Sequence, residues 1–255
     1  CGDCGVQSNC VAVEPVETEF GRKRKINQSS CNKDFSCVNG FCPSFVTVHG
    51  GKLRSGRAGA SKAAPAAPAA PATQKTSIAA AIAKDLPPAT LPSIDGSYAL
   101  MVTGIGGTGV VTVGQLLGMA AHLEGKTVTV LDVTGLAQKN GAVMSFLRFG
   151  NPGEPLYSPR IGLAAADAVL GCDVLVTAGR EALARMAPGR TRVVANLAAT
   201  PTADFTRNPD WKFPLGQMEA SIIAAIGDPS AAAFVDATRL ATALLGDAIA
   251  TNLFM

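Results

Sequence analysis

The sequence is poor in charge and in aromatic side chains. Charged residues make up 16% of its 255 residues and aromatic residues 5%, and the formal net charge is +3. A chain so close to neutral lacks the basic footprint of a nucleic-acid-binding protein. Its apolar runs are also interrupted well before the roughly 18 residues that indicate a transmembrane helix. We therefore expect a soluble enzyme, with neither nucleic acid nor a membrane as a partner.

A secretory signal is missing too. The chain opens with Cys1-Gly2-Asp3-Cys4 and not with a basic stretch followed by an apolar one. Away from the N-terminus the only cysteine is Cys172, which is the cysteine usage of a reduced protein. We expect a cytoplasmic location, and a disulfide framework is the weakest interpretation of the remaining cysteines.

Those remaining cysteines are crowded into the first 42 residues with the spacing C-x2-C-x5-C-x20-C-x5-C-x4-C-P. They are Cys1, Cys4, Cys10, Cys31, Cys37 and Cys42, followed by Pro43. A zinc ribbon would place a second C-x2-C pair about 12 to 20 residues after the first. A Cys-Pro end is instead typical of bacterial ferredoxins. The spacing favours iron–sulfur ligation, and zinc stays open as the alternative.

The number of cysteines matches no complete set of cluster ligands. One cubane cluster takes four thiolates and two take eight, whereas six are present. We therefore expect at least one further ligand upstream. The apolar end, residues 250–255, also lacks a polar tail, so we interpret the sequence as an internal fragment of a longer chain.

Composition divides the chain into three regions. Residues 1–53 are rich in cysteine, glycine and charge, and a metal would have to replace the apolar core in so small a unit. Residues 54–95 contain repeated Ala-Ala-Pro and predict a semi-extended linker, since proline fixes φ and removes a donor. Residues 96–255 are long enough to bury a core of their own.

Strand and helix patterns alternate through residues 96–255. The expected strands are 98–103, 127–133, 142–149, 173–178 and 192–197, and the expected helices are 108–122, 163–170, 180–186 and most of 215–255. Short apolar strands that alternate with helices indicate a mostly parallel sheet with helices on both faces. The predicted fold class is α/β, with a Rossmann-like domain behind the cysteine-rich segment.

A glycine-rich loop follows the first expected strand of this domain. Gly104, Gly106 and Gly109 match G-x-G-x-x-G, Gly107 adds a fourth glycine, and Asp132 ends the next strand. Read as a dinucleotide fingerprint, the glycines approach a phosphate group and the aspartate contacts a ribose hydroxyl. The alternative is that glycine is needed only for a sharp strand-to-helix turn.

A second segment, residues 135–142, should lie beside this loop at the carboxyl edge of the sheet, where ligands of such folds bind. Thr134, Gln138 and Lys139 offer polar groups to an anionic ligand. The segment could equally be an interface loop in which Gly135 and Asn140-Gly141 serve only the backbone.

Two motif sets together resemble a known family. Residues 1–10, 20–37 and 40–45 closely resemble fused bacterial indolepyruvate ferredoxin oxidoreductases, and residues 104–109 and 135–143 resemble the gamma domain of the pyruvate:ferredoxin oxidoreductase superfamily. The resemblance covers nearly the whole chain apart from the Ala/Pro linker. One departure is Asn140, where glycine is expected; asparagine tolerates similar backbone angles.

The resemblance implies oxidative decarboxylation of 2-oxo acids, typically arylpyruvates, to acyl-coenzyme A. It implies that electrons pass through 4Fe–4S clusters to ferredoxin, and that thiamine diphosphate and Mg²⁺ bind in domains that precede Cys1. The six N-terminal cysteines become cluster ligands. This fragment would not catalyse the whole reaction alone, and no residue in it is nominated as a catalytic base. We also expect a homo-oligomer.

Three further features have a plain structural interpretation beside a functional one. His49 is a substitute cluster ligand or, more simply, a structural histidine. Residues 22–25 tune a cluster or attract an acidic ferredoxin, or form a solvated surface loop. Cys172 is most simply a buried small residue.

Two alternatives come from other function classes. One is an NAD-dependent dehydrogenase with an accessory metal cluster. The other is a non-enzymatic zinc-binding assembly module.

Overall fold

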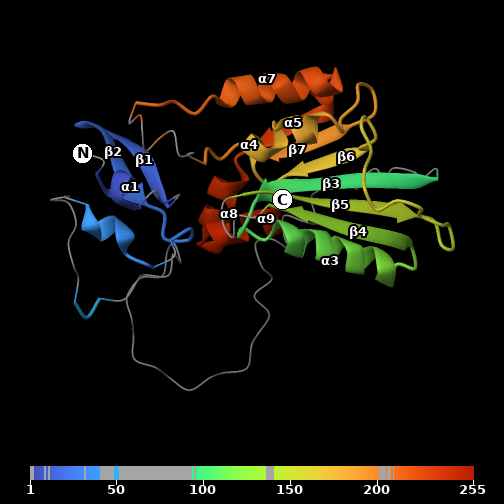
Figure 1. Ribbon diagram of the computed structural model, residues 1–255, viewed down its shortest axis with the longest axis horizontal. Helices are drawn as coiled ribbons and strands as arrows, with labels where there is room; N and C mark the ends of the chain where they lie inside the picture. Colours follow the sequence, from blue (N-terminus) through green and yellow to red (C-terminus); the bar gives the residue numbers. More distant parts are fainter. Residues whose placement is uncertain are drawn as a thin grey trace.

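A computed structural model describes residues 3–8, 10, 12–31, 33–40, 49–51, 94, 96–135, 141–200, 205, 208 and 210–255. Figure 1 shows a small cysteine-rich part beside a larger β-sheet domain. The predicted linker of residues 54–95 lies outside the described residues, apart from Ile94. None of the helices in the described ranges is long and apolar enough to cross a membrane.

The described residues of the cysteine-rich part form a hairpin and two short helical segments. Its elements are α1 (Asp3–Ser8), β1 (Val13–Thr18), β2 (Gly21–Ile26) and the 3₁₀ turn η1 (Ser36–Asn39). The strands β1 and β2 pair antiparallel, with Thr18 opposite Gly21. Gly21 takes a φ of 84°, so the tight turn between the strands needs the left-handed freedom of glycine. The charged run of residues 22–25 is therefore a strand and not a loop.

The β-sheet domain is built on a six-stranded sheet in the order β4-β5-β3-β6-β7-β8. Its strands are β3 (Ser97–Ile105), β4 (Thr127–Thr134), β5 (Ala142–Gly150), β6 (Ala168–Gly171), β7 (Arg192–Asn196) and β8 (Ala232–Val235). The strands β3, β6, β7 and β8 run parallel, and β5 runs antiparallel to both β3 and β4. The sheet is thus mostly parallel, and its carboxyl edge gathers the ends of β3, β6, β7 and β8.

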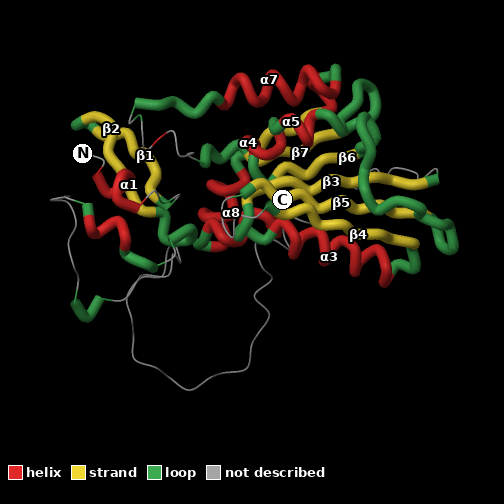
Figure 2. Tube along the Cα trace, viewed as in Figure 1, coloured by secondary structure: helices red, strands yellow, loops and turns green. Residues whose placement is uncertain are grey.

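Helices cover both faces of this sheet (Figure 2). The helices of this domain that the structure describes are α3 (Val110–Leu123), α4 (Val174–Thr177), α5 (Arg180–Leu183), α7 (Leu215–Ile226), α8 (Ala237–Leu245) and α9 (Thr251–Phe254), with the 3₁₀ turns η2 (Pro229–Ala231) and η3 (Ala248–Ala250). Figure 1 shows α3 on one side of the sheet and α7 on the other, with α8 at the edge nearest the cysteine-rich part.

The core follows the alternation of strand side chains. Met101 packs in the cluster that contains Ile222 of α7, whereas its neighbour Val102 packs in the cluster that contains Val113 of α3. Successive residues of a strand point to opposite faces, so β3 supplies one side chain to each layer. Because both faces of β3 are covered, its sequence is a continuous apolar run and does not alternate between apolar and polar residues.

Most of the predicted order of strands and helices is confirmed, with two errors next to each other. Residues 163–170 were expected to be helical, but the structure has no helix there and β6 begins at Ala168. Residues 173–178 were expected to be a strand, but they contain α4. The side chain of Asp173 accepts a hydrogen bond from the Val176 amide and begins this helix. The C-terminal region is mainly helical as expected, but it also contains β8.

Candidate functional site

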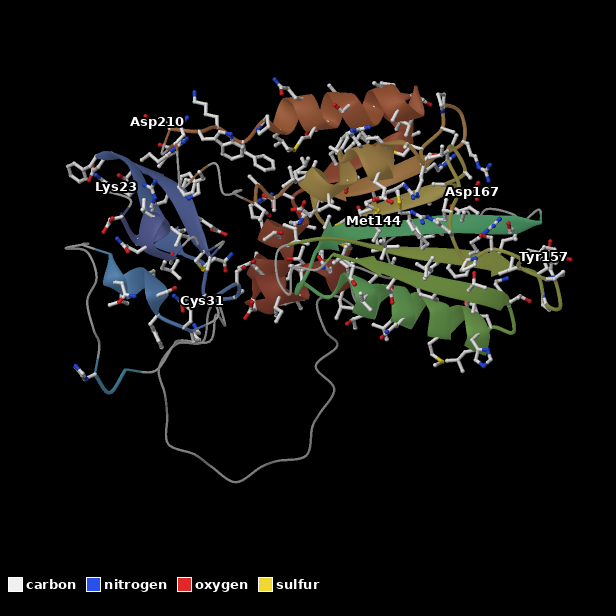
Figure 3. The ribbon with its side chains drawn as sticks, in the orientation of Figure 1. Lys23, Cys31, Met144, Tyr157, Asp167 and Asp210 are labelled. Carbon is white, nitrogen blue, oxygen red and sulfur yellow. The ribbon has the colours of Figure 1, made fainter. Side chains whose placement is uncertain are left out.

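A cavity of about 240 Å³ lies at the carboxyl edge of the sheet, where the cysteine-rich part meets the β-sheet domain. The domain lines it with Ile105, Gly106, Gly107, Thr108, Cys172, Asp173, Asn196, Ala198, Ala199, Thr200, Thr238, Ala248, Ile249, Thr251 and Asn252. The cysteine-rich part lines it with Glu14, Asn27, Ser29, Ser30 and Cys31. Figure 3 shows Cys31 at the edge of the cysteine-rich part that faces the domain. Parts of both predicted sites therefore meet at one cavity.

The four glycines of the predicted motif have different structural roles in the loop. Gly107 and Gly109 have φ angles of 87° and 97°, which side chains rarely tolerate, and so they make the turn from β3 into α3. A Cβ on Gly104 would lie 2.6 Å from Val110 Cγ2, so this glycine allows close packing of strand and helix. The Gly106 amide donates to the Gly141 carbonyl at 2.8 Å, which ties the loop to the start of β5. Of the four, Gly106 and Gly107 line the cavity.

Asp132 lies elsewhere. It sits within β4 opposite Ser145, and β5 separates β4 from β3. In a Rossmann fold the acidic residue ends the strand beside the glycine loop, whereas two strand spacings, about 10 Å, intervene here. The Asp132 Oδ1 and Ser145 Oγ atoms are buried and have no hydrogen-bond partner within the described part of the chain. Asp132 does not line the cavity, and its contact with a ribose stays a prediction.

Of the three polar residues nominated beside the glycine loop, Thr134 lies among the described residues. Thr134 is exposed at the end of β4. Gln138 and Lys139 lie outside the described residues. The hydrogen bond between Gly106 and Gly141 confirms that the end of this segment borders the glycine loop.

Asp173 is a cavity residue that the sequence reasoning missed. Its side chain is buried, and burial raises the pKa of its carboxyl group, although hydrogen bonds from the Val176 amide and the Thr200 side chain act in the opposite direction. A buried carboxyl group at a cavity wall can accept hydrogen bonds from a ligand or hold a proton. A polar residue directly after a buried parallel strand was the available signal, and it was hidden by the expected strand at 173–178.

Asn196 is a second cavity residue that the sequence reasoning missed, and its hydrogen bonds connect three elements around the cavity. Its amide nitrogen donates to the Cys172 carbonyl at 3.2 Å and to Thr238 Oγ1 at 2.9 Å. Its amide oxygen accepts from the Ala237 amide at 3.1 Å. One buried side chain therefore joins the ends of β6 and β7 to the start of α8. A second amide, Asn252 of α9, donates to the carbonyl and the hydroxyl of Thr108 at 2.9 Å each.

Four of the six N-terminal cysteines lie among the described residues. Cys4 is buried on α1, and Cys10, Cys31 and Cys37 are partly buried free thiols. Backbone amides approach two sulfurs, Ala12 N to Cys10 Sγ and Lys33 N to Cys31 Sγ, each at 3.4 Å. Burial raises the pKa of the Cys37 thiol, and the neighbouring thiols of Cys31 and Cys10 raise it further. These three sulfurs are therefore close enough to interact electrostatically.

The donor set fits an iron–sulfur cluster in chemistry. Amide-to-sulfur hydrogen bonds and several nearby thiols are features of cluster sites. Among the described residues, no three His, Cys, Asp or Glu side chains are arranged to hold a single metal ion. Cys1 and Cys42, the first and last of the six, lie outside the described residues. The ligand role of the six cysteines stays a prediction.

Two further residues singled out in the sequence, His49 and Cys172, lie among the described residues. His49 is exposed in a turn. Cys172 is buried at the turn from β6 into α4, and burial raises the pKa of its thiol to about 12. A thiol that stays protonated at neutral pH is inert, which agrees with a packing role.

The fold places this protein among α/β proteins with a mostly parallel sheet and a cavity at the carboxyl edge of that sheet. Residues 99–255 match the model of the family "Pyruvate ferredoxin/flavodoxin oxidoreductase". The chain belongs to this family.

Curated relatives match shorter stretches. The chain is 38% identical over 73 residues to indolepyruvate oxidoreductase subunit IorB of Thermococcus kodakarensis, covering 29% of this chain and 35% of that one. It is 26% identical over 126 residues to the subunit of the same name from Methanothermobacter thermautotrophicus, covering 49% and 61%. The match thus spans about a third of the Thermococcus relative.

Solved structures are similar at lower identity. Pyruvate oxidoreductase subunit PORC of Thermotoga maritima is 18% identical with a TM-score of 0.40, covering 62% of this chain and 71% of that chain. The 2-oxoglutarate:ferredoxin oxidoreductase of Magnetococcus marinus is 16% identical with a TM-score of 0.44, covering 62% and 23%.

Proposed function

We propose that this chain is the electron-transfer segment and the gamma-type domain of an enzyme that oxidatively decarboxylates 2-oxo acids. Indolepyruvate or another arylpyruvate is the proposed substrate, because the curated relatives are named indolepyruvate oxidoreductase subunits. Since those relatives are subunits, the chain is proposed to work within an assembly. One observation carries the proposal: Cys31 of the thiol array and the glycine loop of the family domain line the same cavity.

In the proposed net reaction, a 2-oxo acid and coenzyme A give an acyl-coenzyme A, carbon dioxide and a proton, and the electron pair released reduces oxidised ferredoxin. Thiamine diphosphate with Mg²⁺ supplies the carbon–carbon bond chemistry, and we assign it to a part of the enzyme other than this chain. No side chain described here is assigned a catalytic proton transfer.

The cysteine-rich part is proposed to hold one or more 4Fe–4S clusters. Cys4, Cys10, Cys31 and Cys37 supply thiolates there, together with Cys1 and Cys42. A bound cluster would pass single electrons toward ferredoxin. The amides of Ala12 and Lys33, which approach the sulfurs of Cys10 and Cys31, would tune its reduction potential.

The cavity is the proposed binding place for coenzyme A. Its described lining includes two carboxyl groups, Glu14 and Asp173, and no lysine or arginine. Phosphate groups at this edge would therefore depend on backbone amides of the glycine turn and on the N-terminus of α3. The hydroxyl and amide side chains around Thr200, Thr238 and Asn252 suit the uncharged parts of such a ligand.

Anaerobic reconstitution tests the proposed cofactor. The chain is incubated with iron, sulfide and a thiol without oxygen, desalted, and assayed for iron, acid-labile sulfide and zinc. We expect a brown protein with matched iron and sulfide and a visible thiolate-to-iron absorption. A colourless protein that takes up stoichiometric zinc from a mixture of the metals would support the assembly module instead.

Ligand titration tests the cavity separately. Calorimetry with coenzyme A and with NAD is carried out on the wild type and on Gly106→Val, whose folding is checked by circular dichroism. Heat from coenzyme A that is lost in the variant supports the proposal. Binding of NAD that is lost in the variant would support the dehydrogenase alternative.

A further inference from the structure

The strand β2 has two chemically distinct faces. Its four consecutive cations alternate, with Arg22 and Arg24 partly buried and Lys23 and Lys25 exposed. Because successive side chains of a strand point to opposite faces, both arginines share one face and both lysines share the other. In β2, arginine therefore occurs only on the partly buried face. Arginine differs from lysine in having a planar cation that can stack on an aromatic ring.

The partly buried face contacts the β-sheet domain through Arg24. Its guanidinium carbon lies 4.6 Å from the centroid of the Phe205 ring, and Phe205 is only 2% exposed. A cation over an aromatic face is attracted by the ring quadrupole, and the attraction is stronger where water is excluded. Lysine lacks the flat group that stacks in this way.

Arg22 makes the second contact. Its Nη1 donates to the backbone carbonyl of Trp211 at 2.9 Å, while its Nε pairs with Glu17 on the neighbouring strand at 2.5 Å. The pair with Glu17 orients the guanidinium, so that Nη1 is presented to the β-sheet domain. A hydrogen bond to a charged donor is among the stronger kinds.

A third contact follows the strand. The Ser29 hydroxyl donates to the carboxylate of Asp247, and this hydrogen bond is the main reason why the pKa of Asp247 is lowered. Ser29 belongs to the turn between β2 and Cys31, and Asp247 lies between α8 and η3. The turn is therefore held at the wall of the cavity that it lines.

We propose that the arginine face of β2 docks the cysteine-rich part onto the β-sheet domain, and that the cavity is complete only in this docked arrangement. Docking places Glu14, Asn27 and Cys31 opposite the glycine loop, and undocking would remove that wall. A ligand that fills the cavity touches both parts and so favours the docked state, and by linkage docking favours the ligand. The proposal does not depend on which metal or ligand is bound.

The chain carries a natural reporter for this contact. Trp211 is its single tryptophan, is half-buried, and packs edge-on against Phe213 with ring centroids 5.8 Å apart. Acrylamide quenching of Trp211 is measured in the full 255-residue chain across a urea titration, with unfolding followed in parallel by circular dichroism. The test variant is Arg22→Gln with Arg24→Gln. The matched control is Lys23→Gln with Lys25→Gln, which removes the same charge from the other face.

We expect the arginine pair to lower the ratio of docked to undocked molecules roughly tenfold. Trp211 should then become accessible at a lower urea concentration than in the wild type, before the circular dichroism changes. The lysine pair should behave as the wild type does. Equal effects of both pairs would show a general effect of charge and would overturn the proposal, as would unchanged quenching in the arginine pair.

Substitutions at Phe205, the residue that Arg24 contacts, and a conservative change at Arg24 test the proposal if the double arginine variant fails to fold. Phe205→Leu should expose Trp211 in the same way, and adding Arg24→Gln to it should have less effect than in the wild-type background. Arg24→Lys, which keeps the charge and loses the stacking, should fall between the wild type and Arg24→Gln. Fully additive effects at the two positions would contradict the contact.

Discussion

The two parts of the molecule bury very different amounts of apolar surface. In the β-sheet domain Met101, Phe146 and Ile222 are completely buried on one face of the sheet, and Val102 and Leu147 are completely buried on the other. In the described residues of the cysteine-rich part, the buried apolar side chains are Cys4, Ala12 and Val13, while Phe20 and Phe35 are 78% and 65% exposed. A part with so little apolar core depends on other interactions for its structure. We propose that thiol ligation and docking onto the β-sheet domain supply them.

The largest effect expected from this contrast concerns Phe146. Phe146→Ala leaves a void at a completely buried position of β5 and should lower the free energy of unfolding of the β-sheet domain by about 3–5 kcal/mol. Urea denaturation followed by circular dichroism measures it. Tyr157, which is 92% exposed, is the control, and Tyr157→Ala should change stability by less than about 0.5 kcal/mol. Similar losses in the two variants would contradict the assigned core.

A smaller effect is expected where α3 packs on the sheet. A Cβ on Gly114 would lie 2.9 Å from Ser145 Cβ, so Gly114→Ala should destabilise the domain by about 1–3 kcal/mol through overpacking. Gly216 of α7 is the matched helical control, because nothing lies within 4 Å of the added Cβ. Gly216→Ala should stabilise by about 0.5–1 kcal/mol. The change in the free energy of unfolding of both variants is measured by thermal unfolding. A stabilising effect of Gly114→Ala would show that α3 lies farther from β5.

The smallest expected effect is a pH dependence at the cavity wall. Since burial raises the pKa of Asp173 above its ordinary 3.8, the folded chain binds this proton more tightly than the unfolded chain does. The wild type should therefore lose stability relative to Asp173→Asn as pH rises from the ordinary pKa through the raised one. Thermal unfolding at several pH values measures this difference.

Asp228 should show the opposite dependence of stability on pH. Hydrogen bonds from the Ser230 hydroxyl and amide lower its pKa, so its contribution to stability is present above the ordinary pKa and is lost as pH falls through the lowered one. The wild type should thus lose stability relative to Asp228→Asn on acidification. Curves of the same sign for the two variants would contradict the different environments of the two carboxyl groups.

The long periodic segments of the β-sheet domain were predictable from the sequence. β3, α3, β4, β5 and β7 lie close to the expected ranges because each has a clear apolar pattern. The errors fall on short segments. Residues 163–167 are rich in alanine, yet Ala164 takes a φ of 52°, which no helix contains. The apolar run 174–177 suits a strand or a buried helix equally, and only the cap formed by Asp173 decides.

The candidate site was predictable in part. The glycine loop and Cys31 were nominated separately, and their meeting at one cavity depends on how the two parts pack, which no local pattern encodes. Asp173 and Asn196 reach the cavity because β6 lies next to β3, and β7 next to β6, in the sheet. Asp132 was expected at the same edge, but the insertion of β5 between β3 and β4 places it two strands away. Strand order therefore decides which polar residues come together.

Electron paramagnetic resonance on variants of two cysteines, one in each part of the molecule, tests whether the cysteine-rich part holds an iron–sulfur cluster. The full chain is reconstituted with iron and sulfide without oxygen and reduced with dithionite, alongside Cys31→Ser and Cys172→Ser. The proposed iron–sulfur site predicts a cluster signal in the wild type and in Cys172→Ser, and loss or alteration of that signal in Cys31→Ser. A wild type without any cluster signal, or a signal that depends on Cys172 and not on Cys31, would contradict it.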